Sequence, residues 1–184
     1  INLITENSRF YTTVSINFDE KGLTRFANSE IHQNVYSSDI KVTINIIEDK
    51  KISVVTTNVL EKEDLISALR SAEEKIEYLP QGEIELPKIS DVEAIEIDNY
   101  CLELNKVFDI SNRAELLKHG IEILDEGFIA AGAFSLENAS LAWGNTMGVR
   151  RFSSSSNVNL NVMIIHESGV SGYVNVNATK PEEL

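Results

Sequence analysis

The sequence has few residues that cross-link the chain or interrupt helices and strands: it has one cysteine and three prolines among 184 residues. With a single thiol, Cys101, the chain cannot form an internal disulfide, which agrees with a reducing compartment, so we expect a cytoplasmic protein. No run approaches the roughly 18 consecutive apolar residues of a membrane-spanning helix. The first residues also lack a basic segment followed by an apolar core, so no signal peptide is visible.

Basic residues are scarce as well. The chain has 16 Lys and Arg against 29 Asp and Glu, a formal net charge of −13. Nucleic acids and anionic membranes both require a basic footprint, and no basic run is longer than Arg150–Arg151. We therefore expect neither a nucleic-acid nor a membrane partner.

A complete catalytic set is also missing from the sequence. His166 and Glu167 form a His-Glu pair, but no second histidine follows at the spacing of a zinc site. His32 and His119 have no companions, and Ser153–Ser156 has no nearby base. We expect no catalytic residue, metal ligand or cofactor in this chain. A self-contained hydrolase built on His166 or the serines is a weaker alternative.

The hydrophobic pattern of Phe10–Leu65 recurs later in the chain. Shifted by 118 positions, Phe10 falls on Phe128, Val42 on Leu160 and Ile52 on Val170. A repeat of this length is typical of a duplicated supersecondary unit. The alternative is that two unrelated β-meanders align by their alternation alone.

Alternation and turn residues predict the local structure. We expect strands at 10–18, 23–27, 30–36, 40–47, 51–58, 128–136, 139–144, 148–153, 157–166 and 170–178. The turns between them are expected at 19–22, 28–29, 48–50, 137–138, 144–147, 154–156 and 167–169. Apolar stripes predict helices at 62–78 and 111–125, the second with Ser111 as N-cap and Gly127 as C-cap.

These elements predict an α+β fold, with two related units of antiparallel β-sheet and packed helices. The expected division is a first unit at 1–80, a connector at 81–109 and a second unit at 110–184, cut at the start of its last helix. Part of the connector is alternatively an ordered strap across the sheet. The repeat also predicts a helix upstream of Ile1, so we expect this chain to be a piece of a longer protein.

Two stretches resemble the TldD/PmbA family, once called modulators of DNA gyrase. LTRFANSEIHQN, Leu23–Asn34, is similar to the family's opening signature. Leu141–Leu184 is similar to its second region, in which an Asn-(Ser/Thr)-x-Gly turn precedes alternating strands. The resemblance covers nearly the whole chain, and the two motifs occur in the family's order and at the right separation.

The resemblance implies more than the residues show. Family members are zinc-dependent peptidases, or non-catalytic paralogues that pair with one, and they process peptides and propeptides as homodimers or heterodimers. Their His-Glu-x-x-x-His zinc motif has no match here. The resemblance thus implies an N-terminal portion that shapes the substrate cleft and dimer contacts, with any zinc site in the full-length protein. The alternative is a PmbA-like partner subunit or binding module without peptidase activity.

Five polar residues near turns related by the repeat are our candidates for facing a peptide or protein partner: Arg25, Asn28, His32, Asn145 and Arg150. For Asn28 and Asn145, a purely local role in turn geometry is the favoured alternative, because asparagine side chains bond their own backbone in turns.

Overall fold

The computed structural model describes residues 1–83, 96–104 and 109–180. Its helices are α1 (Asn2–Asn7), α2 (Lys62–Ile76) and α3 (Ile110–Glu122). Its strands are β1 (Tyr11–Ala27), β2 (Glu30–Glu48), β3 (Lys51–Thr57), β4 (Glu96–Asn99), β5 (Phe128–Asn145), β6 (Arg150–His166) and β7 (Ser171–Ala178). None of the described helices is long and apolar enough to cross a bilayer.

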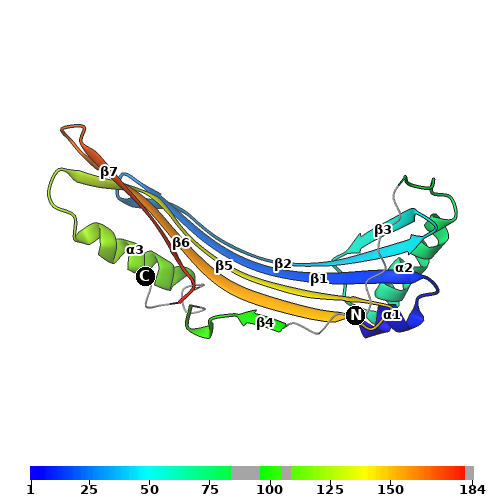
Figure 1. The fold of residues 1–184 in the computed structure, drawn as a ribbon. Helices are drawn as coiled ribbons and strands as arrows, with labels where there is room; N and C mark the ends of the chain where they lie inside the picture. Colours follow the sequence, from blue (N-terminus) through cyan, green and yellow to red (C-terminus); the bar gives the residue numbers. More distant parts are fainter. Residues whose placement is uncertain (84–95, 105–108, 181–184) are drawn as a thin grey trace. The chain divides into compact units, whose positions relative to one another are not determined.

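The strands form one seven-stranded sheet (Figure 1). Its order is β3-β2-β1-β5-β6-β4, and β7 also pairs with β6. Two meanders, β1-β2-β3 and β5-β6-β7, therefore meet where β1 lies beside β5. The predicted α+β class with antiparallel pairing is confirmed.

Contacts within the chain define two compact units, which are described separately below. One comprises Ile1–Phe18, Asp39–Asp98 and Ser140–Ser153, and is called the helix-pair unit. The other comprises 19–38, 99–139 and 154–184, and is called the hairpin unit. Each takes residues from both halves of the sequence. The division at 1–80, 81–109 and 110–184 concerns repeats in the sequence and stays a prediction. Residues 84–95 and 105–108, within its connector, and residues 181–184, where the last helix was expected to begin, lie outside the described residues.

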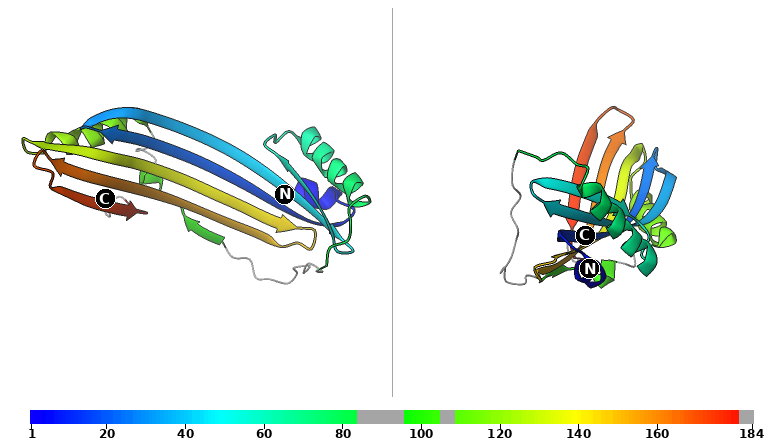
Figure 2. Two further views of the ribbon diagram at one scale, coloured as in Figure 1. Left: turned by 90° about the horizontal axis from the view of Figure 1, so that it is seen from above. Right: turned by 90° about the vertical axis from the view of Figure 1, so that its right-hand side faces the viewer.

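In the helix-pair unit, α1 and α2 cover one side of the β2–β3 hairpin (Figure 2). The apolar stripe of α2 meets the alternating residues of β2, and all of them are almost fully buried: Val42, Ile44, Ile46, Leu69, Ala72 and Ile76. Ile4 of α1 completes this core. Period-two and period-3.6 apolar faces thus meet as the sequence pattern requires.

A buried carboxylate ties α2 to the segment before β1. The side chain of Glu73 is 0% exposed and accepts hydrogen bonds from the backbone N–H of Arg9 at 2.8 Å and from Arg9 Nε at 2.9 Å. Arg70 Nη1 donates to it at 2.6 Å. Burial alone would raise the pKa of Glu73, but these donors outweigh it and hold the pKa below its ordinary value.

In the hairpin unit, α3 packs on strands from both meanders. Leu117 of α3 meets Phe26, Phe134 and Val158, and Leu104 lies in the same buried cluster. Cys101 packs against this core, and its backbone N–H donates to Ser156 Oγ at 3.0 Å.

Three predicted turns are wrong, because β1, β5 and β6 run without a break through 19–22, 137–138 and 154–156. The polar residues there make side-chain bonds along the sheet instead of turning the chain. Lys21 pairs with Glu137 at 2.7 Å. Ser156 Oγ donates to Asn138 Oδ1 at 2.6 Å, and both residues are buried. Strand continuity is therefore preserved by cross-strand polar partners.

Gly22 has a different role from the one its sequence context indicated. It lies within β1, where a Cβ would come within 2.6 Å of Arg113 Nη1. Glycine is needed here for close approach of a side chain, and not for a turn.

The ends of the second predicted helix also differ. Its N-cap is Asp109, whose Oδ1 accepts from the backbone N–H groups of Ser111 and Asn112. Ser111 is already helical. The helix ends at Glu122, and Gly127, at φ +84°, serves the turn before β5 instead of capping α3. Helix α1 was not predicted by its residues.

The two outer hairpins share their register. Val42 lies opposite Thr57, and Leu160 lies opposite Val176, so a shift of 118 matches β2 to β6 and, with one extra residue, β3 to β7. This agrees with the repeat seen in the sequence. The internal duplication itself stays a prediction.

Glu73→Gln should lower the free energy of unfolding by about 1–3 kcal/mol, the range for a hydrogen bond to a charged group. Because the folded-state pKa of Glu73 is depressed, its contribution is present above the unfolded-state pKa and is lost as the pH falls through the folded-state pKa. Wild type should therefore lose its advantage over Glu73→Gln on acidification, as measured by urea unfolding across a pH series.

The matched control is Glu74→Gln, one position along α2 and exposed. It should change the free energy of unfolding by less than about 0.5 kcal/mol. Equal effects of the two substitutions would contradict the role assigned to Glu73.

Candidate functional site

The stretch Leu23–Asn34, which carries the family resemblance, forms the tip of the β1–β2 hairpin in the hairpin unit. The predicted turn at Asn28–Ser29 is confirmed, with both residues at positive φ, 50° and 60°. The Ser29 N–H donates to the Ala130 carbonyl at 2.9 Å, and Ser29 Oγ accepts from the Ala130 N–H at 3.1 Å. The hairpin tip is thereby held against the start of β5.

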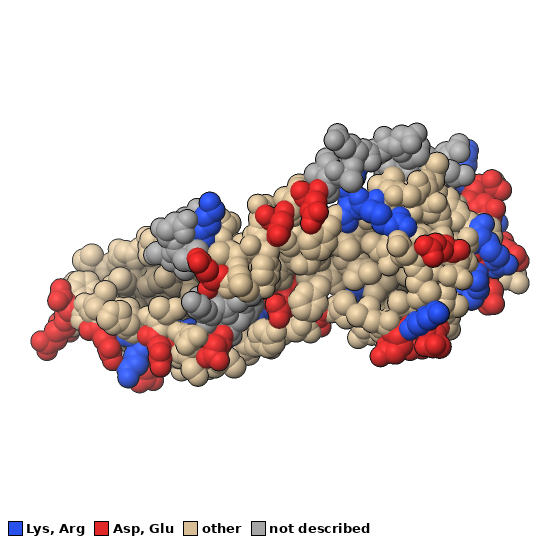
Figure 3. Space-filling model, turned by 90° about the horizontal axis from the view of Figure 1, so that it is seen from below, with Lys and Arg blue, Asp and Glu red and all other residues tan. Residues whose placement is uncertain are grey.

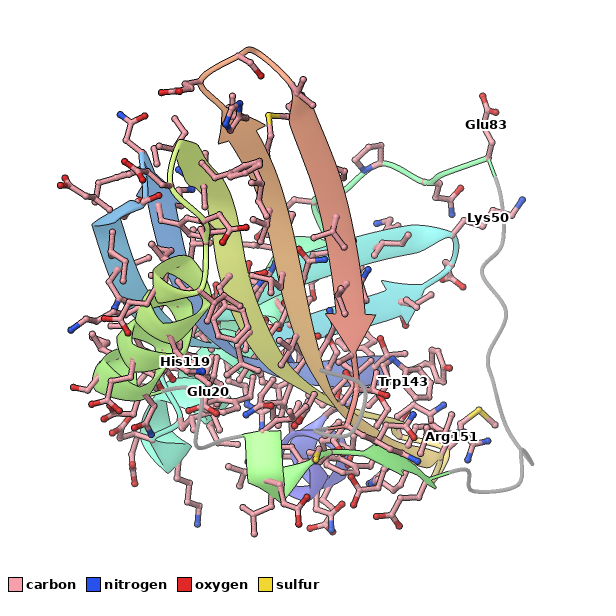
Figure 4. The ribbon with its side chains drawn as sticks, turned by 90° about the vertical axis from the view of Figure 1, so that its left-hand side faces the viewer. Glu20, Lys50, Glu83, His119, Trp143 and Arg151 are labelled. Carbon is pink, nitrogen blue, oxygen red and sulfur yellow. The ribbon has the colours of Figure 1, made fainter. Side chains whose placement is uncertain are left out.

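Helix α3 lies beside this hairpin (Figure 4) and is locked to it by Arg113. The Arg113 side chain is fully buried, at 0% exposure. Its Nε donates to Thr24 Oγ1 at 3.0 Å, and its Nη2 donates to Asn34 Oδ1 at 2.8 Å and to the Val35 carbonyl at 3.2 Å. One planar fork thus fixes the distance between α3 and both strands of the hairpin.

The Arg113 guanidinium remains charged although it is buried. Burial lowers its pKa, and the Asp109 carboxylate acts in the opposite direction. An arginine pKa starts so high that such shifts leave the proton in place at physiological pH. The fork therefore keeps all of its donors at any pH at which the protein is folded.

A groove of about 460 Å³ opens between α3 and the start of β2. Its walls combine apolar and charged side chains: Ser29, Ile31, Ala114, Glu115, Lys118, Ile121 and Glu122. Lys118 and Glu122 form a long ion pair at 3.7 Å on the exposed side of the helix. The groove therefore has an apolar floor and a charged rim.

The same segment of β2 is an edge of the sheet. β2 has β1 on one side, and on the other side β3 pairs only with Val42–Glu48. Among the described residues, no strand pairs with that side of β2 from Glu30 to Ser38. An open strand edge thus runs beside the groove.

Three of the candidate residues predicted from sequence lie on this hairpin. Arg25 is exposed and donates to Gln33 Oε1 at 3.3 Å. Asn28 occupies the turn, and His32 is exposed on β2 next to the groove residue Ile31. Their predicted role in facing a partner stays a prediction.

The other two candidates meet in the helix-pair unit. Asn145 is 0% exposed, and its Oδ1 accepts from the N–H groups of Met147 and Val149. Arg150 donates to the Asn145 carbonyl at 2.8 Å and to Thr5 Oγ1 at 2.9 Å. The pair organises the β5–β6 turn and attaches α1 to it, and its predicted role toward a partner also stays a prediction.

The zinc that the family resemblance implies has no ligand set among the described residues. Among the described residues, no three His, Cys, Asp or Glu side chains lie close enough to hold a metal ion. His166 instead packs against Phe128 with the two rings tilted by 55° and their centroids 4.6 Å apart, and its Nδ1 lies 2.8 Å from Ser168 Oγ. His119 is exposed on α3 (Figure 4). The side chains that the structure describes therefore do not fit a catalytic zinc site.

Arg113 was missed by sequence reasoning, because an arginine next to an apolar helical stripe is ordinarily a solvated residue. A usable signal was present in Gly22, which leaves space for a side chain in the middle of a strand. Thr24 and Asn34 are neutral, so nothing in the sequence indicates that they accept hydrogen bonds from a charged side chain.

Solved structures with the same arrangement settle the fold. A protein of Thermotoga maritima, described as a "putative modulator of a DNA gyrase", superposes at TM-score 0.75 over 95% of this chain, with 19% identity. The chain has a TldD/PmbA-like fold. At this identity, the likeness concerns the fold alone.

Two further structures share the TldD/PmbA-like fold. The Bacteroides thetaiotaomicron protein with the corresponding description matches at TM-score 0.75, 14% identity and 100% of this chain. TldE of Thermococcus kodakarensis matches at TM-score 0.68, 16% identity and 97% of this chain. Our chain covers 40%, 44% and 41% of the three neighbours in turn, about two-fifths of their length. No protein-family model and no curated protein sequence matches it.

Arg113→Lys should lower the free energy of unfolding by at least about 2 kcal/mol, because an ammonium cannot reproduce the fork that reaches Thr24, Asn34 and the Val35 carbonyl. Urea unfolding followed by circular dichroism measures the change. Hydrogen exchange should also accelerate in α3 and in 30–38 before it does so elsewhere.

Arg25→Lys is the control, since Arg25 is exposed and makes one long hydrogen bond. It should cost less than about 0.5 kcal/mol. A loss as large as that of Arg113→Lys would show that any arginine of the hairpin unit has this effect, and would remove the special role of Arg113.

Proposed function

We propose that this chain is the peptide-handling portion of a TldD/PmbA-type protein that takes part in the proteolysis of peptides and propeptides. It contributes to the substrate cleft and to the contacts of a homodimer or heterodimer in the cytoplasm. Any zinc site of the full-length protein is made by residues outside this sequence. Its substrates are peptides or unfolded proteins, and neither nucleic acid nor membrane is a partner.

One observation carries the proposal: the hairpin with the family-like sequence presents an unpaired strand edge beside a groove. Main-chain hydrogen bonds along such an edge bind an extended peptide with little regard to its sequence. A protein that processes varied peptides requires this kind of recognition. The fold shared with TldE and the two gyrase-modulator neighbours supports the same assignment.

Two of the structural neighbours are described as modulators of DNA gyrase, but the charge of this chain disfavours a DNA-binding role. On the face drawn in Figure 3, acidic side chains are spread over the surface, and Lys and Arg form short separate groups. With a net charge of −13, the chain would repel phosphates over most approaches.

The second candidate is a PmbA-like partner subunit that never cleaves peptides. It is favoured by the lack of a metal-ligating cluster among the described side chains. In this role the chain would bind peptides or a catalytic paralogue, and the chemistry would belong to that paralogue. The two candidates share the peptide-binding surface and differ in where the zinc is held.

We expect the purified chain to contain far less than one zinc per protein and to cleave no peptide by itself. Elemental analysis of the protein measures the metal, and mass spectrometry of a casein digest incubated with the chain detects cleavage. The digest alone and the digest with chelator are the controls.

Stoichiometric zinc together with cleavage that the chelator abolishes would overturn the assignment of the zinc site. Should cleavage persist in the chelator and be lost in a folded His166→Ala variant, a self-contained hydrolase would replace both candidates. Zinc without cleavage would indicate a structural metal site and would also contradict the proposal.

A further inference from the structure

We propose that the free edge of β2 from Glu30 to Ser38 accepts an extended peptide as an added strand, with alternate peptide side chains entering the groove beside α3. This inference rests on the proposed function, since it names the surface on which the peptide is held. It deepens that function by assigning one edge out of the several in the sheet.

The edge lacks two of the usual protections against strand addition, although the Val35 carbonyl within it already accepts a hydrogen bond from Arg113. Natural sheets protect open edges with lysine, proline or bulges, because unpaired backbone groups recruit other strands. Glu30–Ser38 contains neither lysine nor proline. It exposes three large side chains instead, Ile31 at 36%, Val35 at 43% and Tyr36 at 47%. An apolar edge without lysine or proline is expected where pairing is the function.

The sheet already carries a short extended segment on a comparable edge. β6 has β5 on one side and both β4 and β7 on the other. Because β7 pairs with Val158–Ile165, β4 pairs with the part of β6 that precedes Val158. In the helix-pair unit, Ile97 of β4 shares a surface pocket with Phe152. A strand of four residues is thus sufficient to cover this edge.

The repeat shift relates that covered edge to the open one. Moving back by 118 positions places Arg150–Ser156 of β6 on His32–Ser38 of β2. The covered edge takes an extended segment with the sequence Glu-Ile-Asp-Asn. The position on β2 that corresponds to it has no such strand among the described residues. The occupant we assign to β2 is therefore of the same kind, an extended peptide supplied from outside the described chain.

The groove defines the side chains that the peptide should carry. Ile31, Ala114 and Ile121 offer an apolar floor that suits a branched aliphatic side chain. Two glutamates and one lysine line the rim, Glu115, Glu122 and Lys118, so the local charge is negative. A neutral or basic peptide with aliphatic residues at alternate positions fits both features.

The helix and the hairpin that form the groove are joined by hydrogen bonds that involve no peptide. Arg113 fixes α3 to β1 and β2, so the width of the groove does not depend on an occupant. A preformed groove reduces the ordering cost of binding, which for a short peptide is a large share of the total.

The test uses the 184-residue chain and a fluorescein-labelled nonapeptide, Lys-Lys-Val-Thr-Ile-Thr-Val-Thr-Lys. Fluorescence anisotropy gives its Kd, and hydrogen exchange locates it. A second nonapeptide with Pro-Gly-Pro at the three central positions controls for charge, since it cannot pair as a strand. Ile31→Asp and Ala114→Arg alter the groove, and Val54→Asp places the same charge on β3, where Val54 is 54% exposed.

We expect the first peptide to bind and to slow hydrogen exchange in 30–38, while the Pro-Gly-Pro peptide does not bind. Ile31→Asp and Ala114→Arg should each weaken binding at least about tenfold, and Val54→Asp should leave it within about twofold, a contrast expected of a pocket position against a remote surface position. Circular dichroism melts show whether each variant is folded, and the two groove variants lie on different elements, so one informs if the other does not fold.

Unchanged binding in both folded groove variants, or protection on β3 or β7 instead of β2, would overturn the inference and leave the peptide-handling function standing. A concentration-dependent dimer that Ile31→Asp dissociates, without peptide binding, would replace the peptide by a second copy of this chain. Absence of any peptide binding to wild type would also reject the inference. The zinc and cleavage measurements judge the proposed function independently of all these outcomes.

Discussion

A buried guanidinium that must find acceptors is the constraint on which the hairpin unit depends. Arg113 has no contact with water, so Thr24, Asn34 and the Val35 carbonyl have to lie where its fork points. Removing one of these acceptors would leave part of a buried charge without a hydrogen-bond partner. The free-energy cost of this is larger than the stabilisation that a surface hydrogen bond provides. In the helix-pair unit the buried charge has the opposite sign. There the carboxylate of Glu73 is buried and accepts hydrogen bonds from Arg9 and Arg70.

The sequence predicted the fold where a periodic pattern and a local turn signal agreed. The turns at Asn28–Ser29 and Asp49–Lys50 have consecutive residues at positive φ, and the α2 stripe packs as its spacing requires. It failed where polar residues interrupt a long strand. Asn138 and Ser156 are typical of turns, and only the tertiary structure shows that each is the other's partner. Single-residue propensity is overridden there by pairing across the sheet.

The site was predictable only in part, and for a related reason. Leu23–Asn34 marked the hairpin correctly as a distinctive stretch, and Arg25, Asn28 and His32 do lie on it. The edge could not be predicted, since an edge is a property of strand order and not of the strand. One wall of the groove is α3, which lies about 80 residues downstream of the hairpin in the sequence. No local sequence pattern can therefore predict that the helix and the hairpin come together.

The position of the lone thiol has a practical consequence. Cys101 lies two residues after the end of β4, and its backbone N–H donates to Ser156 Oγ, so the thiol lies beside a hydrogen bond that ties this segment to β6. A thiol-reactive dye or spin label attaches at this one place without any substitution. A label at this position lies next to the contact between this segment and β6. The native sequence thus provides one labelling site beside β4, at which detachment of this segment from β6 can be followed.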